Sequence, residues 1–504
     1  MSERADQHPE PDLVDFASPS ARAALERLGA ATWREALDWL YGVAMARPMN
    51  ADTYPAARER YFGGADVGPA PAPADPASSA EVLAEFRERI APYTYNAQHP
   101  GSFSYFTPPP LPVSIAGEVL AQWLHQGVDV WHAGPIGAFV EEEVTSWLRE
   151  LCGIGAEGWG ILTSGGVMAN LMAMTVARDV HLARLRFGSD GSAGGPGDAP
   201  PPPRGAALEG VRVYASDQAH FSIGRSLEML GFPRDTLHVV PSDDEFRLPA
   251  QPVAAAVAED RAAGRIPFAI AAVAGTTNTG AVDDVPGLAV VAERERLWLH
   301  VDAAYGGAAR LSTRDAGRVP GLELADSVTV DPHKWFFQAY DIGGLVVRRR
   351  EDLHRTFTMS PEYYRAPRPE EQPLDWYQYS LEGTRRFRAL KLWTSWKHLG
   401  TRGFGALVER NVDLARHLAD RLRAGGFEVI DPPLSIVCFR WPGGDDAAQD
   451  ALQRALEVSG EGWVSTTVLR GRTYLRAGVV NYLSTPADAD RVVDALARHA
   501  SELP

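Results

Sequence analysis

Lys334 is the residue whose surroundings first suggest chemistry. It lies in the segment ADSVTVDPHKWFF, residues 325–337, after a β-branched run and between His333 and Trp335. A lysine at the end of a strand inside a cleft can have its pKa lowered by burial, which makes its amine a nucleophile. The alternative is a surface lysine, which the neighbouring histidine and tryptophan disfavour.

Two further segments place glycines or a carboxylate directly after a predicted strand. In TSGGVMANL, residues 163–171, Gly165 and Gly166 join a strand to a helix, and the unpaired amides at a helix N-terminus bind phosphate well. In LHVDAAYGG, residues 299–307, Asp302 follows an apolar strand, where a buried carboxylate needs a cationic or hydrogen-bonding partner. Taken singly, the first segment is more simply an ordinary strand–helix turn. The second is equally consistent with a structural salt bridge.

His220 adds a flat ring to these groups. It follows a strand in ASDQAHFSIGRS, residues 215–226, where it could stack on a ligand or serve in acid–base chemistry. A structural histidine is the commoner explanation for any single histidine. Together, however, a phosphate cradle, a buried acid, a stacking ring and a nucleophilic lysine are what pyridoxal phosphate requires. The lysine holds the aldehyde as a Schiff base, and the acid keeps the pyridine nitrogen protonated.

The composition indicates an acidic chain without disulfides or membrane spans. Its 504 residues carry 65 acidic and 49 basic side chains, a net charge of −16, which argues against nucleic-acid and anionic-membrane partners. Cys152 and Cys438 are too few for a disulfide framework, and no paired cysteine spacing suggests zinc. We therefore expect no metal site and a reducing, cytoplasmic setting. The polar N-terminus lacks the apolar core of a signal peptide, and no apolar run is long enough to cross a bilayer.

The elements that must position these residues are short apolar strands alternating with helical stretches in the middle of the chain. This alternation predicts an α/β fold with a mainly parallel seven-stranded sheet, in which ligands bind at the carboxyl ends of the strands. We predict an N-terminal helical segment over residues 1–112, a large cofactor-binding domain over 113–395 and a small α+β domain over 396–504. Two stretches rich in proline, alanine and glycine, residues 63–80 and 188–207, are predicted to be exposed connections.

Several segments resemble the group II pyridoxal-phosphate decarboxylases, the family that includes aromatic L-amino acid decarboxylase and glutamate decarboxylase. The likeness extends from about residue 18 to the end of the chain, and DPHKW and HVDAAYGG are its most specific blocks. The other segments are HPGSFSYFTP, TSGGVMANL, SDQAH, AGTTNTGAVDD, TRRFRALKLW, LSIVCFR and YLRAGVVNY. The resemblance implies the aminotransferase-like pyridoxal-phosphate fold, fold type I, and decarboxylation of an amino acid. It also implies a homodimer with active sites at the subunit interface and N-terminal helices that clasp the partner.

The resemblance further implies roles for individual residues. Lys334 would be the Schiff-base lysine, Asp302 the partner of the pyridine nitrogen, and His220 the ring that stacks on one cofactor face. The residues expected to hold the cofactor are Gly165, Gly166, Val167, His220, Thr277, Asp302, Ala304, Asp331, His333 and Lys334. Those expected at the entrance of the substrate pocket are Phe106, Thr107, Pro108 and Trp131.

A polar, proline-rich segment, residues 356–373, resembles the mobile catalytic loop of the family. Its Tyr363 matches the tyrosine that, in the family, returns a proton to the substrate carbon after CO₂ leaves, with His220 assisting. The adjacent Tyr364 is the alternative for this role, and two surface aromatic residues are the alternative to both. A phenylalanine at this position favours aldehyde formation in the family, so its absence, together with the presence of His220, favours simple decarboxylation.

Two positions depart from the family pattern. Val167 lies where the aromatic branch more often has serine or threonine, so only a backbone amide remains to bind the phosphate, and lower cofactor affinity is expected. Asp331 lies where asparagine is also common. Because a second negative charge beside a phosphate is unfavourable, we expect the Asp331 carboxylate to be paired or to point elsewhere.

The apolar, aromatic segments YFTPPPLP and VWHAGPIG favour an aromatic L-amino acid as substrate, and the first offers no fixed cation for a side-chain carboxylate. Glutamate, aspartate and aliphatic amino acids are alternative substrates. Transamination and oxidative formation of an aldehyde are alternative reactions on the same cofactor. A non-catalytic binding protein is the last alternative, and the presence of Lys334, Asp302, His220 and Tyr363 together argues against it.

Overall fold

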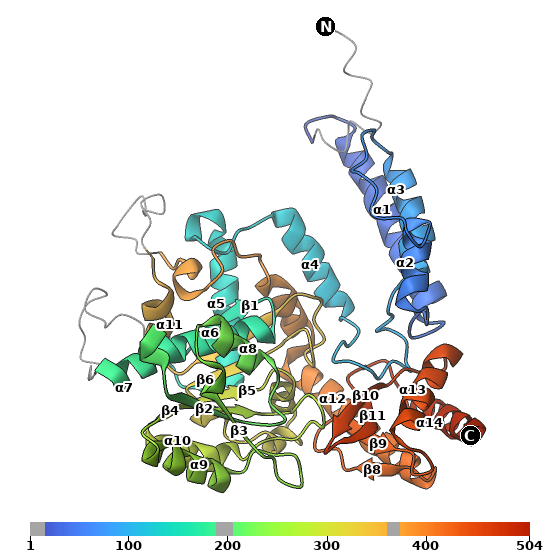
Figure 1. The fold of residues 1–504 in the computed structure, drawn as a ribbon. Coiled ribbons are helices and arrows are strands. Elements are labelled where there is room, and N and C mark those ends of the chain that lie inside the picture. The colour runs from blue at the N-terminus through green and yellow to red at the C-terminus, as the bar shows by residue number, and fades with distance from the viewer. Residues whose placement is uncertain (1–15, 188–204, 360–372, 504) are drawn as a thin grey trace.

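The computed structural model describes residues 16–187, 205–359 and 373–503. Figure 1 shows a helical arm near the N-terminus, a large α/β body and a smaller α+β unit at the C-terminus. The domain boundaries at residues 112/113 and 395/396 stay predictions. The second of them falls inside the long helix α12 (Ala389–Ala424), which is interrupted by a non-helical residue at Gly400.

A seven-stranded sheet forms the centre of the body and confirms the predicted α/β fold. Its strands are β1 (Trp159–Thr163), β2 (Val211–Ser216), β3 (Leu237–Val240), β4 (Ile266–Val273), β5 (Trp298–Asp302), β6 (Ser327–Val330) and β7 (Gly343–Val347). Their order is β1-β7-β6-β5-β4-β2-β3, and neighbours run parallel except around β7, which is antiparallel to β1 and β6. Each strand coincides with an apolar run of the sequence, because a parallel sheet covered by helices needs continuously hydrophobic strands.

Helices cover this sheet (Figure 1). They are α5 (Pro135–Leu151), α6 (Gly166–Val176), α7 (Ala183–Phe187), α8 (Ser222–Met229), α9 (Ala250–Ala262), α10 (Val285–Glu295) and α11 (Arg350–Phe357). Most of α6 is buried, including the apolar run Leu171–Met174, since it packs against β6 and β7 and against α8. The helix that follows the glycine turn is therefore anchored in the core.

The C-terminal unit has its own sheet and its own hydrophobic core. Strands β8 (Glu428–Ile430), β9 (Ile436–Arg440), β10 (Ser465–Leu469) and β11 (Arg472–Gly478) form an antiparallel sheet in the order β10-β11-β9-β8. Helices α13 (Asp446–Ser459) and α14 (Pro486–Glu502) pack with this sheet and with the second half of α12. This arrangement agrees with the predicted small α+β unit.

The N-terminal arm consists of α1 (Ala21–Trp39), α2 (Tyr54–Phe62) and α3 (Ser79–Glu85), and Figure 1 shows it projecting from the body. Large apolar side chains on it are exposed, among them Trp33 (53%), Tyr41 (74%) and Tyr54 (79%). The connection over residues 63–80 is exposed along nearly all its length, as predicted, whereas residues 188–204 lie outside the described part of the chain. No helix within the described ranges has the length and apolar character to cross a membrane.

Candidate active site

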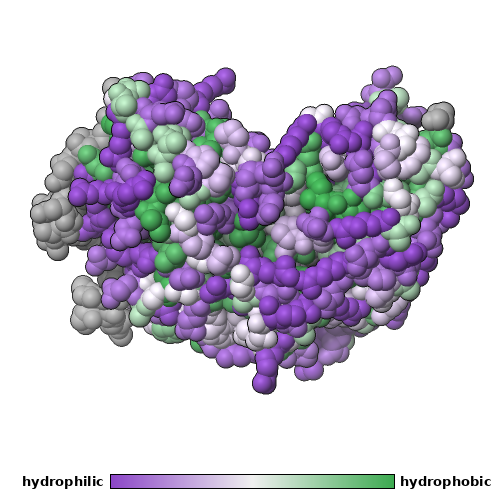
Figure 2. All heavy atoms as spheres, turned by 90° about the horizontal axis from the view of Figure 1, so that it is seen from below, coloured by the Kyte–Doolittle hydropathy of each residue, from purple (hydrophilic) through white to green (hydrophobic). Residues whose placement is uncertain are grey.

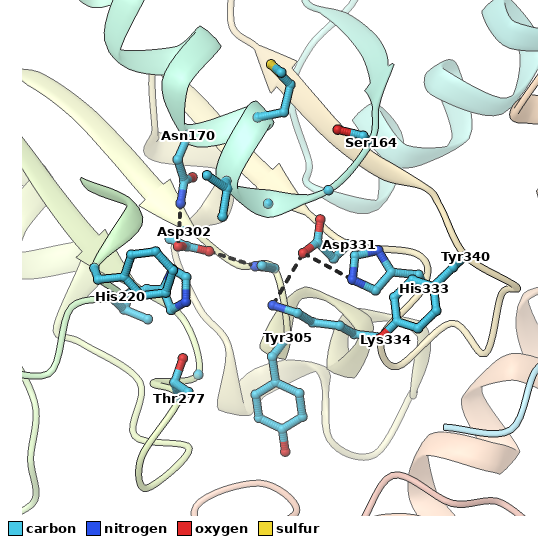
Figure 3. Close-up of a pocket in the computed structure, with 18 residues that line it drawn as sticks. Ser164, Asn170, His220, Thr277, Asp302, Tyr305, Asp331, His333, Lys334 and Tyr340 are labelled. Atoms are coloured by element: carbon cyan, nitrogen blue, oxygen red, sulfur yellow. Dashed lines mark hydrogen bonds and ion pairs between the residues drawn. The ribbon is translucent and has the colours of Figure 1, made fainter. Parts of the chain in front are cut away.

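The residues predicted to hold the cofactor converge on one cavity of about 440 Å³ (Figure 3). Every one of them lines it: Asp302 is the last residue of β5, and the others come from the segments that follow β1, β2, β4, β5 and β6. Chain segments after so many different strands meet where the carboxyl ends of a mainly parallel sheet converge, which is where open α/β sheets bind ligands.

The turn between β1 and α6 has the geometry of an anion cradle. The amide of Gly165 lies 3.3 Å from Oγ1 of Thr163, and α6 begins at the next residue. The amides of the first helical turn therefore have no acceptor inside the helix. Gly166 leaves room that a side chain would fill, because an added Cβ would lie 2.7 Å from Oδ2 of Asp331. Val167 offers its backbone amide to an anion and a hydrocarbon side chain that is 40% exposed.

Lys334 lies inside the cavity instead of on the outer surface. Its Nζ lies 3.3 Å from Oδ2 of Asp331, and Nε2 of His333 lies 3.8 Å from the same oxygen (Figure 3). Asp331 is only 1% exposed. At an effective dielectric constant of about 20, unit charges at this separation attract by roughly 5 kcal/mol before desolvation is subtracted. The carboxylate of Asp331, where asparagine is also common in the family, is thus paired as expected, and its partner is Lys334.

Asp302 presents a buried carboxylate to the cavity. Its Oδ2 accepts a hydrogen bond of 2.8 Å from Nδ2 of Asn170, and its Oδ1 accepts one of 3.1 Å from the amide of Ala304. In the part of the chain that the structure describes, no basic side chain lies within ion-pair distance of Asp302, so the structural salt bridge is not observed there. A buried carboxylate with hydrogen bonds but no cation suits a cationic ligand group, such as a protonated pyridine nitrogen.

His220 lines the cavity from the loop after β2 (Figure 3). Burial lowers the pKa of His220 below its usual value; the carboxylate of Asp302 opposes this shift and the ammonium of Lys334 adds to it. The imidazole is therefore mainly neutral at pH 7 and carries one ring proton. Its Nδ1 lies 2.8 Å from Oγ of Ser222. A neutral, oriented imidazole can both stack on a ligand ring and exchange a proton.

The segment predicted at the substrate entrance borders this cavity through Phe106. The centre of its ring lies 4.4 Å from that of Tyr305, which lines the cavity, and 5.7 Å from Nζ of Lys334. Thr107 is half-buried and its hydroxyl is bonded to the phenol of a nearby tyrosine, while Pro108 is buried.

Three other residues that were predicted for the site, Trp131, Tyr363 and Tyr364, are not seen at the cavity in the described part of the chain. Trp131 is not among the lining residues, and its amide donates a 2.8 Å hydrogen bond to Oδ1 of Asp375. Its place in the substrate pocket therefore stays a prediction. Tyr363 and Tyr364 lie outside the described residues.

The structure adds three residues that sequence reasoning did not select. Asn170 lines the cavity from α6, and Tyr340 lines it from beyond β6, where burial raises the pKa of its phenol to about 12. Arg476 is 5% exposed, and its guanidinium lies 4.7 Å from the centre of the Phe106 ring. The segment YFTPPPLP itself holds no cation, but the fold brings one to it. Asn170 and Arg476 lie in two of the segments that resemble the family, TSGGVMANL and YLRAGVVNY, and this position was the only indication in the sequence that they belong to the site.

These side chains fit pyridoxal phosphate. Free amides at the start of α6 can bind a phosphate, and the carboxylate of Asp302 lacks a cation of its own. The amine of Lys334 lies on the same cavity, together with the flat ring of His220. Each group matches one functional part of the cofactor, and the turn, the acid and the lysine come from three different strand ends.

Comparison with known proteins agrees with this fit. A family model for the pyridoxal-dependent decarboxylase conserved domain matches residues 65–442. The aromatic-L-amino-acid decarboxylase of Bacillus atrophaeus is 31% identical over 84% of this chain and 86% of its own. The L-2,4-diaminobutyrate decarboxylase of Rhizobium meliloti (strain 1021) is 32% identical over 84% of this chain and 82% of its own. The solved structure of Oryza sativa TDC with PLP and tryptamine superimposes with a TM-score of 0.83 at 25% identity, covering 96% of this chain and 98% of that one.

Proposed function

Because the chain belongs to the pyridoxal-dependent decarboxylase family and is a pyridoxal-phosphate-dependent amino acid decarboxylase, we propose that its substrate is an aromatic L-amino acid. The products would be the corresponding amine and CO₂. The observation that carries the proposal is the aromatic wall beside the amine of Lys334.

That wall consists of three rings in contact, of which Tyr305 and Trp335 are stacked and Phe106 is tilted against Tyr305. Phe106 packs on Tyr305 with centroids 4.4 Å apart, and Tyr305 packs on Trp335 with centroids 5.0 Å apart and planes 21° apart. Contacts between aromatic rings contribute about 0.5–1.5 kcal/mol beyond the burial of their area. A flat substrate side chain beside Phe106 would gain such a contact. The aromatic-L-amino-acid decarboxylases among the relatives support the same choice.

A diamino acid is the second candidate, because two relatives are L-2,4-diaminobutyrate decarboxylases. A substrate with a distal ammonium group needs a carboxylate to receive it. Asp302 and Asp331 are the acidic residues that line the cavity in the described chain, and Asp331 is already paired with Lys334. Asp302 would be taken by the cofactor. This distribution of charge favours the aromatic substrate over the diamino acid.

The site residues keep the roles predicted from the sequence. Pyridoxal phosphate, when bound, supplies the electron sink that makes loss of CO₂ possible. Lys334 would hold its aldehyde carbon, Asp302 would keep a proton on its ring nitrogen, and the α6 turn would bind its phosphate. His220 would cover one face of the ring. Tyr363, outside the described residues, stays the predicted proton donor to the substrate carbon.

The active enzyme is further proposed to be a homodimer. The arm exposes Trp33, Tyr41 and Tyr54, and of its three helices only α1 contains a buried residue, Ala21. Helix α4 (Pro112–Leu124) adds Trp123, 64% exposed, to the apolar surface that a second copy would cover. Sedimentation of the full chain tests this, with a monomer as the contrary result. The cytoplasmic setting stays a prediction.

The chain is well suited to a direct test of the lysine, because Lys334, Lys391 and Lys397 are its only lysines. Lys391 is fully buried against Glu118, and Lys397 is exposed and paired with Glu143. We expect the protein with pyridoxal phosphate to show a visible absorption band. Reduction with borohydride should then fix the cofactor on the peptide that contains Lys334. Lys334→Ala should lose the band, and Lys397→Ala, the matched control, should keep it.

The substrate is tested by a screen for CO₂ release. L-Tyrosine, L-tryptophan, L-phenylalanine and L-3,4-dihydroxyphenylalanine should be decarboxylated faster than L-glutamate, L-aspartate or L-2,4-diaminobutyrate. Amine should accompany the CO₂, since aldehyde and ammonia would indicate the oxidative reaction. A preference for diaminobutyrate would overturn the aromatic proposal and leave the decarboxylase intact. The absence of any band or label at Lys334 would overturn the assignment of the site.

A further inference from the structure

We propose that Asn170 is a positioning residue that orients the carboxylate of Asp302 and the ring proton of His220 toward the cavity, a role that rests on the proposed function. Asn170 is 1% exposed and belongs to α6, behind the phosphate turn. Its amide makes two donated and two accepted hydrogen bonds, and Figure 3 shows the one to Asp302.

The carboxylate of Asp302 determines how the amide of Asn170 is turned. A carboxylate only accepts, so the atom 2.8 Å from Oδ2 of Asp302 is the amide nitrogen Nδ2. The amide oxygen then faces the other way, where it accepts from Oγ1 of Thr329 at 2.7 Å and from Nε2 of His300 at 3.0 Å. His300 is fully buried, and burial lowers its pKa, so it is neutral at pH 7 with its proton on Nε2.

The far end of the network requires the same direction. Since His300 holds its proton on Nε2, its Nδ1 accepts, and Oγ of Ser327 lies 2.9 Å away as the donor. Ser327 in turn accepts from Nε1 of Trp298 at 2.9 Å. An indole N–H can only donate and a carboxylate can only accept. Groups with a single possible role therefore stand at both ends, and the bonds between them have one consistent direction.

A branch of the network carries this direction to His220. Nδ2 of Asn170 also donates to Oγ of Ser222 at 2.8 Å, which leaves the hydroxyl proton of Ser222 to be donated to Nδ1 of His220, also at 2.8 Å. The amide of Ser222 faces the same nitrogen at 3.4 Å. Because two donors face Nδ1, the single proton of the neutral imidazole lies on Nε2.

The cavity thus receives an acceptor at Asp302 and a donor at His220 from one buried amide. Groups held in this way need no reorganisation when a ligand arrives, which strengthens their interaction with it. The charged groups that act on His220 are Asp302, Lys334, Asp331 and Arg225. None of them hydrogen-bonds to Nδ1, so within the described chain the tautomer is set through Ser222 and Asn170.

Three variants of the full chain separate the branches. Asn170→Asp keeps size and shape but replaces the donor Nδ2 by an oxygen that donates only when the introduced carboxyl group is protonated. Ser222→Ala removes the side-chain link to His220 and leaves the bond between Asn170 and Asp302. Thr329→Val is the matched control, because it removes a neighbour of the amide oxygen and leaves both donations from Nδ2.

The first readout is the ring proton itself. In protein labelled with ¹⁵N-histidine and free of cofactor, the signals of His220 are assigned by their absence in His220→Gln. We expect a protonated Nε2 and an unprotonated Nδ1 in the wild type and in Thr329→Val, and a mixture of tautomers in Ser222→Ala. A wild-type proton on Nδ1, or no change in Ser222→Ala, would overturn the proposal.

The second readout is the affinity for pyridoxal phosphate as a function of pH. Asn170→Asp should bind it at least tenfold more weakly than the wild type at pH 8 and recover toward pH 6, as the introduced carboxyl group regains a proton for Asp302. A purely structural lesion would not recover with falling pH. Wild-type affinity in Asn170→Asp at pH 8 would count against the role of Asn170. If the wild type binds no pyridoxal phosphate, the proposed function fails instead, and the ¹⁵N readout still decides how the network is oriented.

Discussion

Replacing Gly166 by alanine tests whether the start of α6 is shaped as the structure shows. In a helix, alanine in place of glycine normally stabilises a protein by about 0.5–1 kcal/mol. Here the added Cβ would lie 2.7 Å from Oδ2 of Asp331, closer than real Cβ contacts allow, and 3.5 Å from Cβ of Ala304. Asp331 cannot yield freely, because the same oxygen lies 3.3 Å from Nζ of Lys334.

The magnitude follows from these opposing effects. Overpacking of a close-packed site costs roughly 1–3 kcal/mol, so after the helix gain of about 0.5–1 kcal/mol we expect a net loss of up to about 2.5 kcal/mol in the free energy of unfolding. Any shift of Asp331 also moves the partner of Lys334, so we expect at least tenfold weaker binding of pyridoxal phosphate. Urea unfolding of the cofactor-free protein measures the first effect, and titration of the visible band measures the second.

Gly224 in α8 provides the control for this substitution. A Cβ added there would meet Cδ2 of Leu237 at 3.5 Å, an ordinary contact. Gly224→Ala should therefore leave stability unchanged or raise it slightly, with wild-type cofactor affinity. If Gly166→Ala proved as stable as Gly224→Ala and bound the cofactor as tightly as the wild type, the close approach of Gly166 to Asp331 would be refuted.

Three further predictions concern buried groups. The side chains of Glu141 and Arg385, which form an ion pair, are 0% and 1% exposed, so Glu141→Ala should lower the free energy of unfolding, measured with urea, by about 3–5 kcal/mol. Glu143 forms an exposed pair with Lys397, so Glu143→Ala should lower it by less than about 1 kcal/mol. Burial lowers the pKa of His300 to about 4, so between pH 6.5 and 4 the unfolded chain binds more protons than the folded one, and the free energy of unfolding should decrease as the pH is lowered through this range. The decrease should be less steep in His300→Gln, and equal slopes in the two proteins would contradict the burial of a neutral imidazole. Burial raises the pKa of Cys152 and of Cys438 to about 12, so a thiol reagent at pH 8 should find no reactive cysteine in the native protein and two after unfolding; fast reaction in the native state would show that one of them is accessible.

The strands and the phosphate turn could be predicted because their signals are local. Each buried strand of the large sheet is a short apolar run bounded by turn residues, and the loops that follow the strands hold the polar groups. Lys334, Asp302, His220 and the α6 turn were found in this way, since position after a strand is enough to place a residue at the carboxyl edge of the sheet. The family resemblance then supplied Thr277, Ala304 and Asp331, which the local pattern does not distinguish from ordinary loop residues.

The contacts that the sequence could not predict join segments far apart in the chain. Arg476 donates to the carbonyl oxygen of Ser104 at 2.8 Å across 372 positions, and it reaches Phe106 only because the C-terminal sheet packs against the entrance segment. Asn170 looks like a polar residue in an apolar helix, and its role depends on bonds to Asp302 and His300, 132 and 130 positions away. Neither hydrophobic periodicity nor a sequence motif indicates such long-range pairings.

The basic residues of the chain are nearly all arginines, which makes the presence of a lysine at position 334 informative. Arginine accounts for all of the 49 basic side chains except Lys334, Lys391 and Lys397. Arginine serves well in ion pairs but stays protonated and does not act as an amine nucleophile, so an ion pair alone would not require lysine at position 334. Lys391 and Lys397 pair with Glu118 and Glu143, both away from the cavity. Lys334 is the lysine that lines the cavity, and its nearest carboxylate, on Asp331, lies 3.3 Å away. Because arginine could supply the positive charge beside Asp331 but not a nucleophilic amine, Lys334→Arg, which preserves charge, should fail to form the visible band as completely as Lys334→Ala.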